Sequence, residues 1–368
     1  MAPAAVSPER PSATLPNSDG IEKSTTYVPP QQPLTYSGSL DQYKSFDSTN
    51  VIGREFPDLQ LSEILDDDSK IRDLAILVSQ RGVVFFRKQE LNIDDQKILG
   101  QKLGKLTGKP WTSRLHKHAL YNASRGLKID EHGRADDEIS IISSVQNRAH
   151  DAAKYKAASP YLASEGWHAD ISFEPIPSDY AILKITEVPE DAGGDTLWAS
   201  GYEAYDRLSP AFKALAEGLT ATHHTPEFLN TARKHGLKLF DGERGAPENV
   251  GLDFEASHPV IRTNPVTGWK SLFGAAGQLK DGWIDGVTPR ESELLKEYFL
   301  QLIANNHDLQ VRFRWGENDV AIWDNRSVFH TATNDYHGSR QGNRVVSLGE
   351  KPYFDAKSVS RREALGQR

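Results

Sequence analysis

Residues 167–173, Trp-His-Ala-Asp-Ile-Ser-Phe, are the most informative stretch of the chain, and His330 follows far downstream. Residues two apart in a strand face the same side, so His168 and Asp170 can bind one metal ion from one extended segment. The third ligand must come from a strand that the fold brings alongside, and His330 ends the β-like run 319–330. Two histidines and a carboxylate in this order are typical of the facial triad that holds non-haem Fe(II) and leaves positions open for a co-substrate and O2.

The His-x-Asp pattern alone is weak evidence, because a chain with 12 histidines contains such a pattern by chance. Its surroundings strengthen it. Ile171, Phe173 and the run 180–185 are typical of strands, and Gly193-Gly194 predicts a turn that enters a further strand. Arg340 and Arg344 follow the distal histidine and lie on the same side if their segment is extended.

Composition excludes several classes of protein. The net charge of −8 argues against a nucleic-acid-binding protein, which normally carries a basic footprint. The sequence contains no run of roughly 18 apolar residues, the length that predicts a membrane span. The N-terminus has neither the charged nor the apolar region of a signal peptide. We therefore expect a cytoplasmic protein. The absence of cysteine excludes disulfides, thiolate ligands and thiol nucleophiles.

The chain divides into a tail and one domain. Residues 1–38 are rich in Pro, Ser, Thr and Gln and predict a disordered tail. Residues 39–368 are expected to form a single domain. Two polar segments without clear periodicity, near 128–165 and 225–258, are predicted to lie over the mouth of the active site.

Helix signals are clear at four places. Periodic apolar residues predict helices over 67–80 and 93–106, with Asn92 as the cap of the second and Ile98 on its apolar stripe. Ser-Pro at 209–210 and Thr-Pro at 288–289 each predict a helix start. Many short strands with Gly and Pro turns and a few helices indicate a mainly β protein with flanking helices, a two-sheet jelly roll.

Three segments, 167–209, 323–336 and 344–352, resemble the taurine/sulfonate dioxygenase family, which uses Fe(II) and α-ketoglutarate. The similarity extends from about Leu40 to about Tyr353. It implies the double-stranded β-helix of that family, in which residues from distant strands meet at the mouth of the barrel.

The resemblance also implies roles for site residues. It makes His168, Asp170 and His330 the Fe(II) ligands. Arg340 would anchor the far carboxylate of α-ketoglutarate, with Thr196 beside it, and Arg344 would bind the substrate sulfonate. The segment between His330 and the two arginines is one residue shorter than in some relatives, so an exchange of the two arginine roles stays open.

The substrate pocket is implied by fewer residues. His118 matches the family histidine that donates to the sulfonate, and Tyr121 matches a nearby aromatic wall. Ser164 stands where taurine-binding members usually carry an amide, which favours other alkyl sulfonates. A rival metal site at His116 and His118 lacks a carboxylate at ligand spacing.

The resemblance therefore implies a dioxygenase that hydroxylates an alkyl sulfonate at C1 and releases sulfite and an aldehyde with succinate and CO2. An alternative is the same cofactor chemistry, as hydroxylation, desaturation or cyclisation, on a small amino or carboxylic acid or a sulfate ester. A non-catalytic jelly-roll binding protein is disfavoured by the complete triad and both arginines. The expected partners are a small anionic substrate and, by analogy, further copies of the chain in a dimer or tetramer, with no nucleic acid and no membrane.

Overall fold

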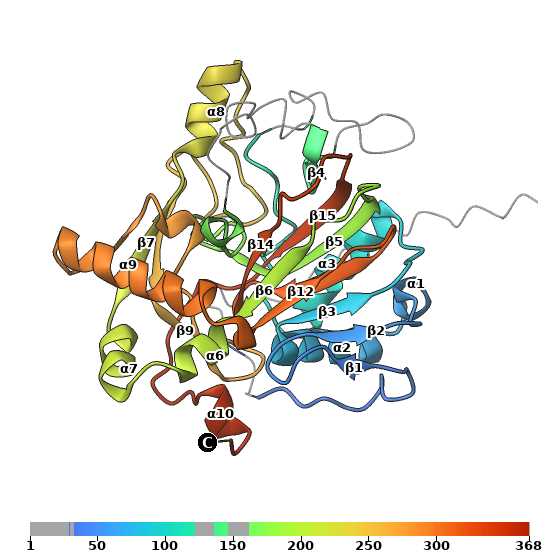
Figure 1. The fold of residues 1–368 in the computed structure, drawn as a ribbon, viewed down its shortest axis with the longest axis horizontal. Coiled ribbons are helices and arrows are strands. Elements are labelled where there is room, and N and C mark those ends of the chain that lie inside the picture. Colours follow the sequence, from blue (N-terminus) through green and yellow to red (C-terminus); the bar gives the residue numbers. More distant parts are fainter. Residues whose placement is uncertain (1–28, 30–32, 121, 123–135, 146–161, 368) are drawn as a thin grey trace, which may run out of the picture.

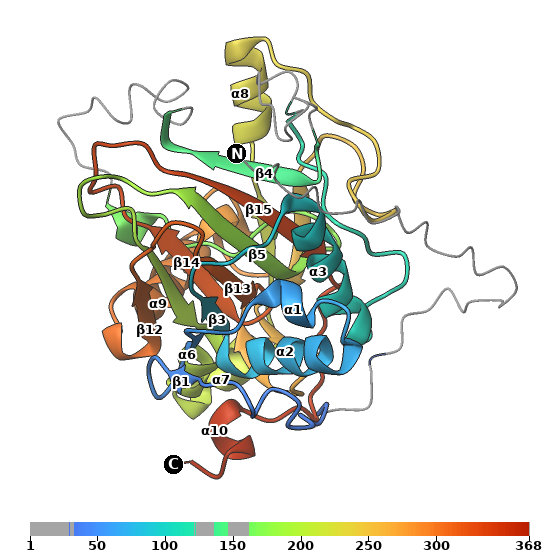
Figure 2. The same ribbon diagram turned by 90° about the vertical axis from the view of Figure 1, so that its right-hand side faces the viewer.

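The computed structural model describes residues 29, 33–120, 122, 136–145 and 162–367 (Figures 1 and 2). Tyr121, most of the predicted tail 1–38 and most of the predicted lid 128–165 lie outside these ranges. None of the helices within them has both the length and the apolar composition of a membrane span.

The larger of two principal sheets contains seven strands in the described ranges, in the order β1-β2-β3-β13-β5-β15-β4. They are β1 (Phe46–Asp47), β2 (Arg54–Phe56), β3 (Val83–Phe86), β13 (Val320–Asp324), β5 (Ser178–Glu187), β15 (Gln341–Leu348) and β4 (Ile139–Ser143). β2 and β3 are parallel, and the other neighbours are antiparallel. The central strands β3 and β13 are buried throughout, because both faces of the sheet are covered.

The second sheet has the order β12-β6-β14. Its strands are β12 (Gln310–Phe313), β6 (Thr196–Ser200) and β14 (Val328–Ala332). Large side chains of the two sheets meet in one core: the Phe85 and Trp198 rings are 5.3 Å apart, and those of Trp198 and Trp323 are 5.8 Å apart. Two packed sheets with helices outside form the predicted jelly roll.

Helices cover the outer face of the larger sheet, as Figure 2 shows for α1 (Leu61–Ile64), α2 (Asp68–Arg81) and α3 (Ile93–Leu106). The predicted helix starts are confirmed: Asp67 and Asn92 accept backbone N–H groups at the starts of α2 and α3, and Thr288 forms a capping box with Glu291. Ile98 is an exception on the predicted stripe of α3, since it is 47% exposed.

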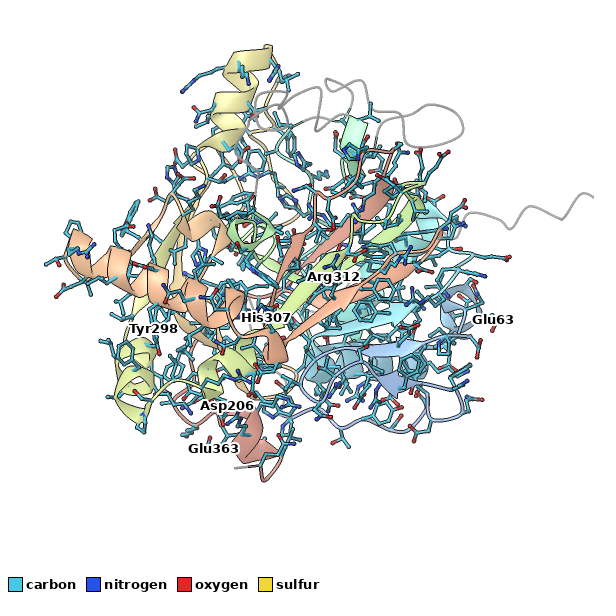
Figure 3. All side chains as sticks on the ribbon, viewed as in Figure 1. Glu63, Asp206, Tyr298, His307, Arg312 and Glu363 are labelled. Atoms are coloured by element: carbon cyan, nitrogen blue, oxygen red, sulfur yellow. The ribbon has the colours of Figure 1, made fainter. Side chains whose placement is uncertain are left out.

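The remaining elements lie around the smaller sheet and below it (Figure 1). The α-helices among them are α6 (Gly201–Asp206), α7 (Pro210–Glu217), α8 (Glu227–His235), α9 (Pro289–Ala304) and α10 (Arg361–Ala364). The strands form the sheets β11-β7-β8 (Trp283–Ile284, Thr220–His224, Glu255–Pro259) and β10-β9 (Lys270–Leu272, Ile261–Thr263). The 3-10 turns are η2 (Ala163–Glu165), η3 (Gly277–Leu279) and η4 (His307–Leu309). Arg312 of β12, labelled in Figure 3, pairs with Asp195 ahead of β6 at 2.7 Å.

The single strand predicted for 319–330 is wrong. β13 ends at Asp324 and belongs to the larger sheet, whereas β14 begins at Val328 and belongs to the smaller one. Asp324 makes the corner, because its Oδ1 accepts the N–H of Arg326 and its carbonyl accepts the N–H of Ser327, both at 3.0 Å. The chain therefore changes sheets between the predicted strand start and His330.

Two further expectations differ from the structure. Ile171 and Phe173 lie in a turn and not in a strand, since Ile171 has a φ of 49° and the chain bends directly after Asp170. The segment 225–258 is not wholly irregular, because it contains α8 and part of β8. Few of the nine residues of α8 are apolar, so its pattern is easily taken for a loop.

Candidate metal centre

His168 and His330 meet across a backbone bridge. The N–H of His168 donates to the carbonyl of His330 at 2.9 Å, and the N–H of His330 donates back at 2.8 Å. Residues paired in this way send their side chains to the same side, and the two ring centroids are 4.1 Å apart. β14 thus brings its histidine to the predicted motif as an antiparallel neighbour.

Asp170 reaches the same point by the turn after the bridge. Its Oδ1 lies 3.8 Å from Nε2 of His168 and 3.8 Å from Nε2 of His330. The potential ligand atoms of all three residues lie within 4.8 Å of one another. Across the described ranges, this is the one group of three or more His, Cys, Asp or Glu side chains close enough to hold a metal ion.

The hydrogen bonds and charges around the three side chains suit a metal ion. Nδ1 of His168 is 2.8 Å from the Gly166 carbonyl and must be its donor, so Nε2 is the ring nitrogen that faces Asp170 and can bind a metal ion. Burial lowers the pKa of His330 well below its ordinary value, so that imidazole is neutral. Burial alone would raise the pKa of Asp170, but the charge of Arg344 holds it below its ordinary value. A neutral imidazole, as at His330, and a carboxylate, as at Asp170, are the forms that bind metal ions.

One oxygen of the carboxylate is without a protein partner. Oδ2 of Asp170 is buried and accepts no hydrogen bond from the described residues. A buried carboxylate oxygen is costly to leave unsatisfied. The residues present therefore fit an ion at this position.

Arg340 and Thr196 lie together, as the resemblance implies. Nε of Arg340 donates to the Gly194 carbonyl at 2.9 Å, and Nη2 lies 3.5 Å from Oγ1 of Thr196. Trp315 donates to the same hydroxyl at 2.9 Å. Burial lowers the pKa of Arg340, and none of the ion pairs among the described residues joins its guanidinium to a carboxylate. Arg340 is thus a buried cation without an ion-pair partner among the described residues, and such a cation fits an anionic co-substrate.

Arg344 is in a different position from Arg340. It lies within β15, opposite Leu183 of β5, and its Nη1 is 2.6 Å from Oδ1 of Asp170. Its Nε is buried and unpartnered among the described residues. The sequence contained no signal for this ion pair, because it joins residues of distant elements through side chains alone.

Of the other predicted pocket residues, the structure describes His118 and Ser164. The ring of His118 packs at 5.5 Å against Phe228 of α8, which packs at 5.3 Å against Phe173. Its Nδ1 accepts the N–H of Leu120 at 3.0 Å. Ser164 is exposed on η2, and Tyr121 lies outside the described residues.

The rival metal pair at His116 and His118 is not formed. His116 is buried, with Nε2 3.5 Å from Oε1 of Glu174. That carboxylate is also held by Arg244, through Nε at 2.5 Å. His116 therefore belongs to a buried polar cluster, and His118 packs against α8.

Gly277 packs directly against His168, so a side chain at this position should disturb the metal centre. Its φ is +50°, and an added Cβ would lie 2.6 Å from Cβ of His168. We expect Gly277→Ala to lower the free energy of unfolding by about 1–3 kcal/mol and to weaken metal binding, because His168 must move. Thermal unfolding and metal titration would measure both effects.

Gly236→Ala is the control, since Gly236 has a similar φ of +63° but nothing within 4 Å of an added Cβ. Equal loss of metal affinity in both variants would contradict this account.

The fold and this centre define a class: a jelly-roll protein with a His-Asp-His triad that fits a metal ion and a buried arginine, Arg340, beside Thr196. The chain matches the family model "Taurine catabolism dioxygenase TauD, TfdA family" over residues 44–346. The alpha-ketoglutarate-dependent dioxygenase btcD of Neocamarosporium betae is 46% identical over 91% of this chain and 98% of that protein. A putative alpha-ketoglutarate-dependent sulfonate dioxygenase of Schizosaccharomyces pombe is 36% identical over 83% of this chain and 70% of that protein.

A solved structure agrees with these relatives. A taurine dioxygenase from Burkholderia xenovorans superposes with a TM-score of 0.62 and 25% identity over 85% of this chain and 91% of that one. The chain belongs to the taurine catabolism dioxygenase TauD, TfdA family. It is an α-ketoglutarate-dependent dioxygenase that uses Fe(II), α-ketoglutarate and O2.

Proposed function

We propose that the protein hydroxylates an alkyl sulfonate at the carbon next to sulfur. One atom of O2 enters the substrate and the other enters succinate, and the hydroxylated carbon then releases sulfite as it becomes an aldehyde. CO2 leaves from α-ketoglutarate. The observation that carries the proposal is Arg344, a second cation beside the triad whose Nε has no partner among the described residues. A sulfonate presents oxygens that match such a donor.

Each site residue then has one task. His168, Asp170 and His330 hold Fe(II), and the bound metal with O2 supplies the oxidation. Arg340 and Thr196 hold the far carboxylate of α-ketoglutarate, which orients its other end toward the triad. Arg344 fixes the sulfonate, and His118 donates a further hydrogen bond to it. The protein thus contributes position and fixed charge.

The same proposal treats residues 39–368 as one catalytic domain. The segment 225–258 covers its mouth, with Phe228 of α8 resting on Phe173 and on His118. Phe173 follows Asp170 closely in the chain, so a movement of α8 would shift Phe173 and change the packing next to the metal centre. The predicted lid near 128–165 lies mostly outside the described residues, and its covering role stays a prediction from the sequence. Self-association and a cytoplasmic location stay predictions from the sequence.

The alternative has a specific observation in its favour. The relative that is 46% identical is named only as an α-ketoglutarate-dependent dioxygenase, whereas the relative named for sulfonate is 36% identical. A planar carboxylate also suits Arg344. Under this alternative the same cofactor chemistry acts on a small amino or carboxylic acid or on a sulfate ester.

A substrate panel separates the two. The protein is loaded anaerobically with Fe(II) and α-ketoglutarate and then exposed to O2 with linear alkyl sulfonates, taurine, sulfate esters or amino acids, and succinate and sulfite are measured together. We expect equal amounts of both products with an alkyl sulfonate and less turnover with taurine, because Ser164 offers no amide to its amine. Omitting α-ketoglutarate is the control. Succinate formation stimulated only by an amino or carboxylic acid, without sulfite, would contradict the sulfonate proposal.

A further inference from the structure

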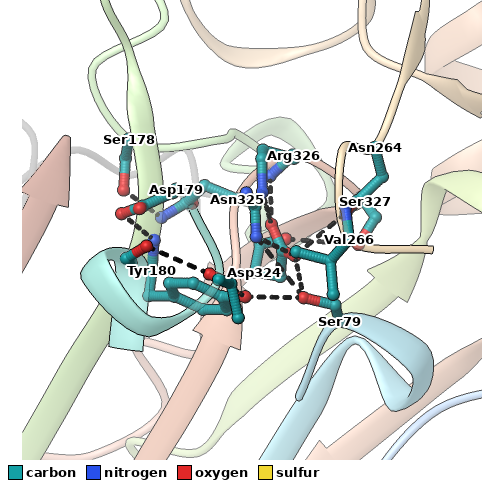
Figure 4. Close-up of polar contacts among 12 residues, drawn as sticks. Ser79, Ser178, Asp179, Tyr180, Asn264, Val266, Asp324, Asn325, Arg326 and Ser327 are labelled. Atoms are coloured by element: carbon teal, nitrogen blue, oxygen red, sulfur yellow. Dashed lines mark hydrogen bonds and ion pairs between the residues drawn. The ribbon is translucent and has the colours of Figure 1, made fainter. Parts of the chain in front are cut away.

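The corner between β13 and β14 contains a buried amide that faces the metal centre. Asn325 is 1% exposed and follows Asp324 at the point where the chain passes from one sheet to the other. Its backbone N–H donates to the Asp179 carbonyl at 2.8 Å, and its Nδ2 donates to Oγ of Ser178 at 2.9 Å. Both partners lie at the start of β5, so the side chain is anchored to the larger sheet (Figure 4).

The other end of this amide accepts two hydrogen bonds. Oδ1 of Asn325 accepts the backbone N–H of Asp170 at 3.0 Å and the indole Nε1–H of Trp323 at 3.0 Å. Both partners can only donate, so the oxygen and not the nitrogen of the amide must face them. An amide oxygen has two lone pairs, and both are used.

The two donors belong to different parts of the metal centre. Asp170 carries the carboxylate of the triad. Trp323 packs against the other side of the centre, with its ring centroid 4.9 Å from that of His330. One oxygen atom therefore holds the backbone of one triad residue and orients the ring that packs on another.

Asp170 needs such a support because it does not lie in a regular strand. The next residue, Ile171, is β-branched and has a φ of 49°. A left-handed conformation costs about 1–2 kcal/mol for a residue with a side chain, and it persists only where its surroundings determine it. The hydrogen bond from Asp170 to Asn325 is one contact that holds the turn, and the bond from the Glu174 N–H to the Ile171 carbonyl at 3.1 Å closes it.

We infer that Asn325 is a positioning residue for the metal centre. It keeps the Asp170 carboxylate at ligand distance from both imidazoles and keeps Trp323 against His330. It touches neither substrate nor metal and acts through these two residues. The inference rests on His168, Asp170 and His330 as the metal ligands, and it is independent of which organic substrate is oxidised.

The test compares two buried asparagines. Asn249 is 0% exposed, accepts the N–H of Ile176 at 2.9 Å and donates to the carbonyl of the same residue at 2.8 Å. Asn249 thus binds backbone groups through its side chain, as Asn325 does, but the backbone that it holds is that of Ile176 and not that of Asp170. Asn325→Ala and Asn249→Ala are each prepared metal-free, and Co(II) affinity is measured by calorimetry together with the melting temperature.

We expect both variants to melt at lower temperature, whereas only Asn325→Ala loses Co(II) affinity, by roughly 10- to 100-fold. Unchanged affinity in Asn325→Ala, or an equal loss in both variants, would overturn the inference. Asp170→Ala is measured beside them. If Asp170→Ala still binds Co(II) normally, the ligand assignment itself has failed; if it loses the metal and Asn325→Ala does not, only the positioning role has failed.

A second variant covers the case in which Asn325→Ala does not fold. Ser178→Ala removes the hydroxyl that accepts the hydrogen bond from Nδ2 of Asn325 and keeps the amide itself. Oδ1 can then still accept from Asp170, but the side chain that carries it is held less firmly. We expect a loss of Co(II) affinity of roughly threefold to tenfold, the effect of one lost hydrogen bond. Affinity equal to that of the unchanged protein would count against the inference.

Discussion

Asp170→Ala will lose metal binding and turnover together. Its carboxylate is the one anionic donor of the triad, and without it only the two imidazoles remain. Changes outside the ligand set cost about 10- to 100-fold in metal affinity or activity, so we expect the loss of a ligand to exceed ~100-fold. Metal content of the reconstituted protein and succinate formation from α-ketoglutarate measure the two effects.

The same substitution should also alter the metal-free protein. Arg344 would lose the partner that lies 2.6 Å from its Nη1, and its side chain is only 18% exposed. We therefore expect a lower melting temperature without metal. Asp308→Ala is the control, because it removes an exposed carboxylate that pairs with Arg207 far from the triad. Stoichiometric Fe(II) in Asp170→Ala would refute the ligand assignment.

Arg340→Met should separate co-substrate binding from stability. The guanidinium is buried and has no carboxylate partner among the described residues, so an apolar side chain of similar length can be neutral or stabilising. Loss of a buried charge that binds an anion costs about 2–5 kcal/mol. We expect the KM for α-ketoglutarate to rise by roughly 30-fold or more, with a melting temperature unchanged or higher.

Arg344→Met is the matched variant for this experiment. If the roles follow the geometry, it should raise the KM of the organic substrate and leave that of α-ketoglutarate nearly unchanged. The reverse pattern would show that the two arginines exchange roles, the alternative that the shortened segment after His330 leaves open. Initial rates with each substrate varied in turn distinguish the two patterns.

Sequence signals were sufficient where the interactions are local. Asn92 and Thr288 cap the helices that they predict, because a cap binds backbone groups within three residues of itself. Asp67, expected as the first helical residue, is the cap of α2. The triad was also found from the sequence, since His-x-Asp with a distant histidine is restrictive when strands surround it. Thr196 and Arg340 came from the resemblance and lie side by side in the structure.

Other features depend on contacts between distant segments. The corner at Asp324 was missed although residues 324–327 are polar, because the apolar and β-branched residues on either side, at 320–323 and 328–329, favour one strand over the run 319–330. The turn at Ile171 contradicts the usual preference of a β-branched residue, and contacts from Asn325 and the turn itself maintain it. The pairing of Arg344 with Asp170 has no local pattern at all.

The backbone bridge between His168 and His330 has a consequence for how the protein acquires its metal. The two residues lie on segments far apart in the sequence, so a growing chain that ends before β14 has no complete set of ligands. A metal that binds only the finished fold adds its binding free energy to the stability of the whole barrel. Loss of the ion would therefore lower the stability of the whole fold and not only that of the segments that carry the ligands.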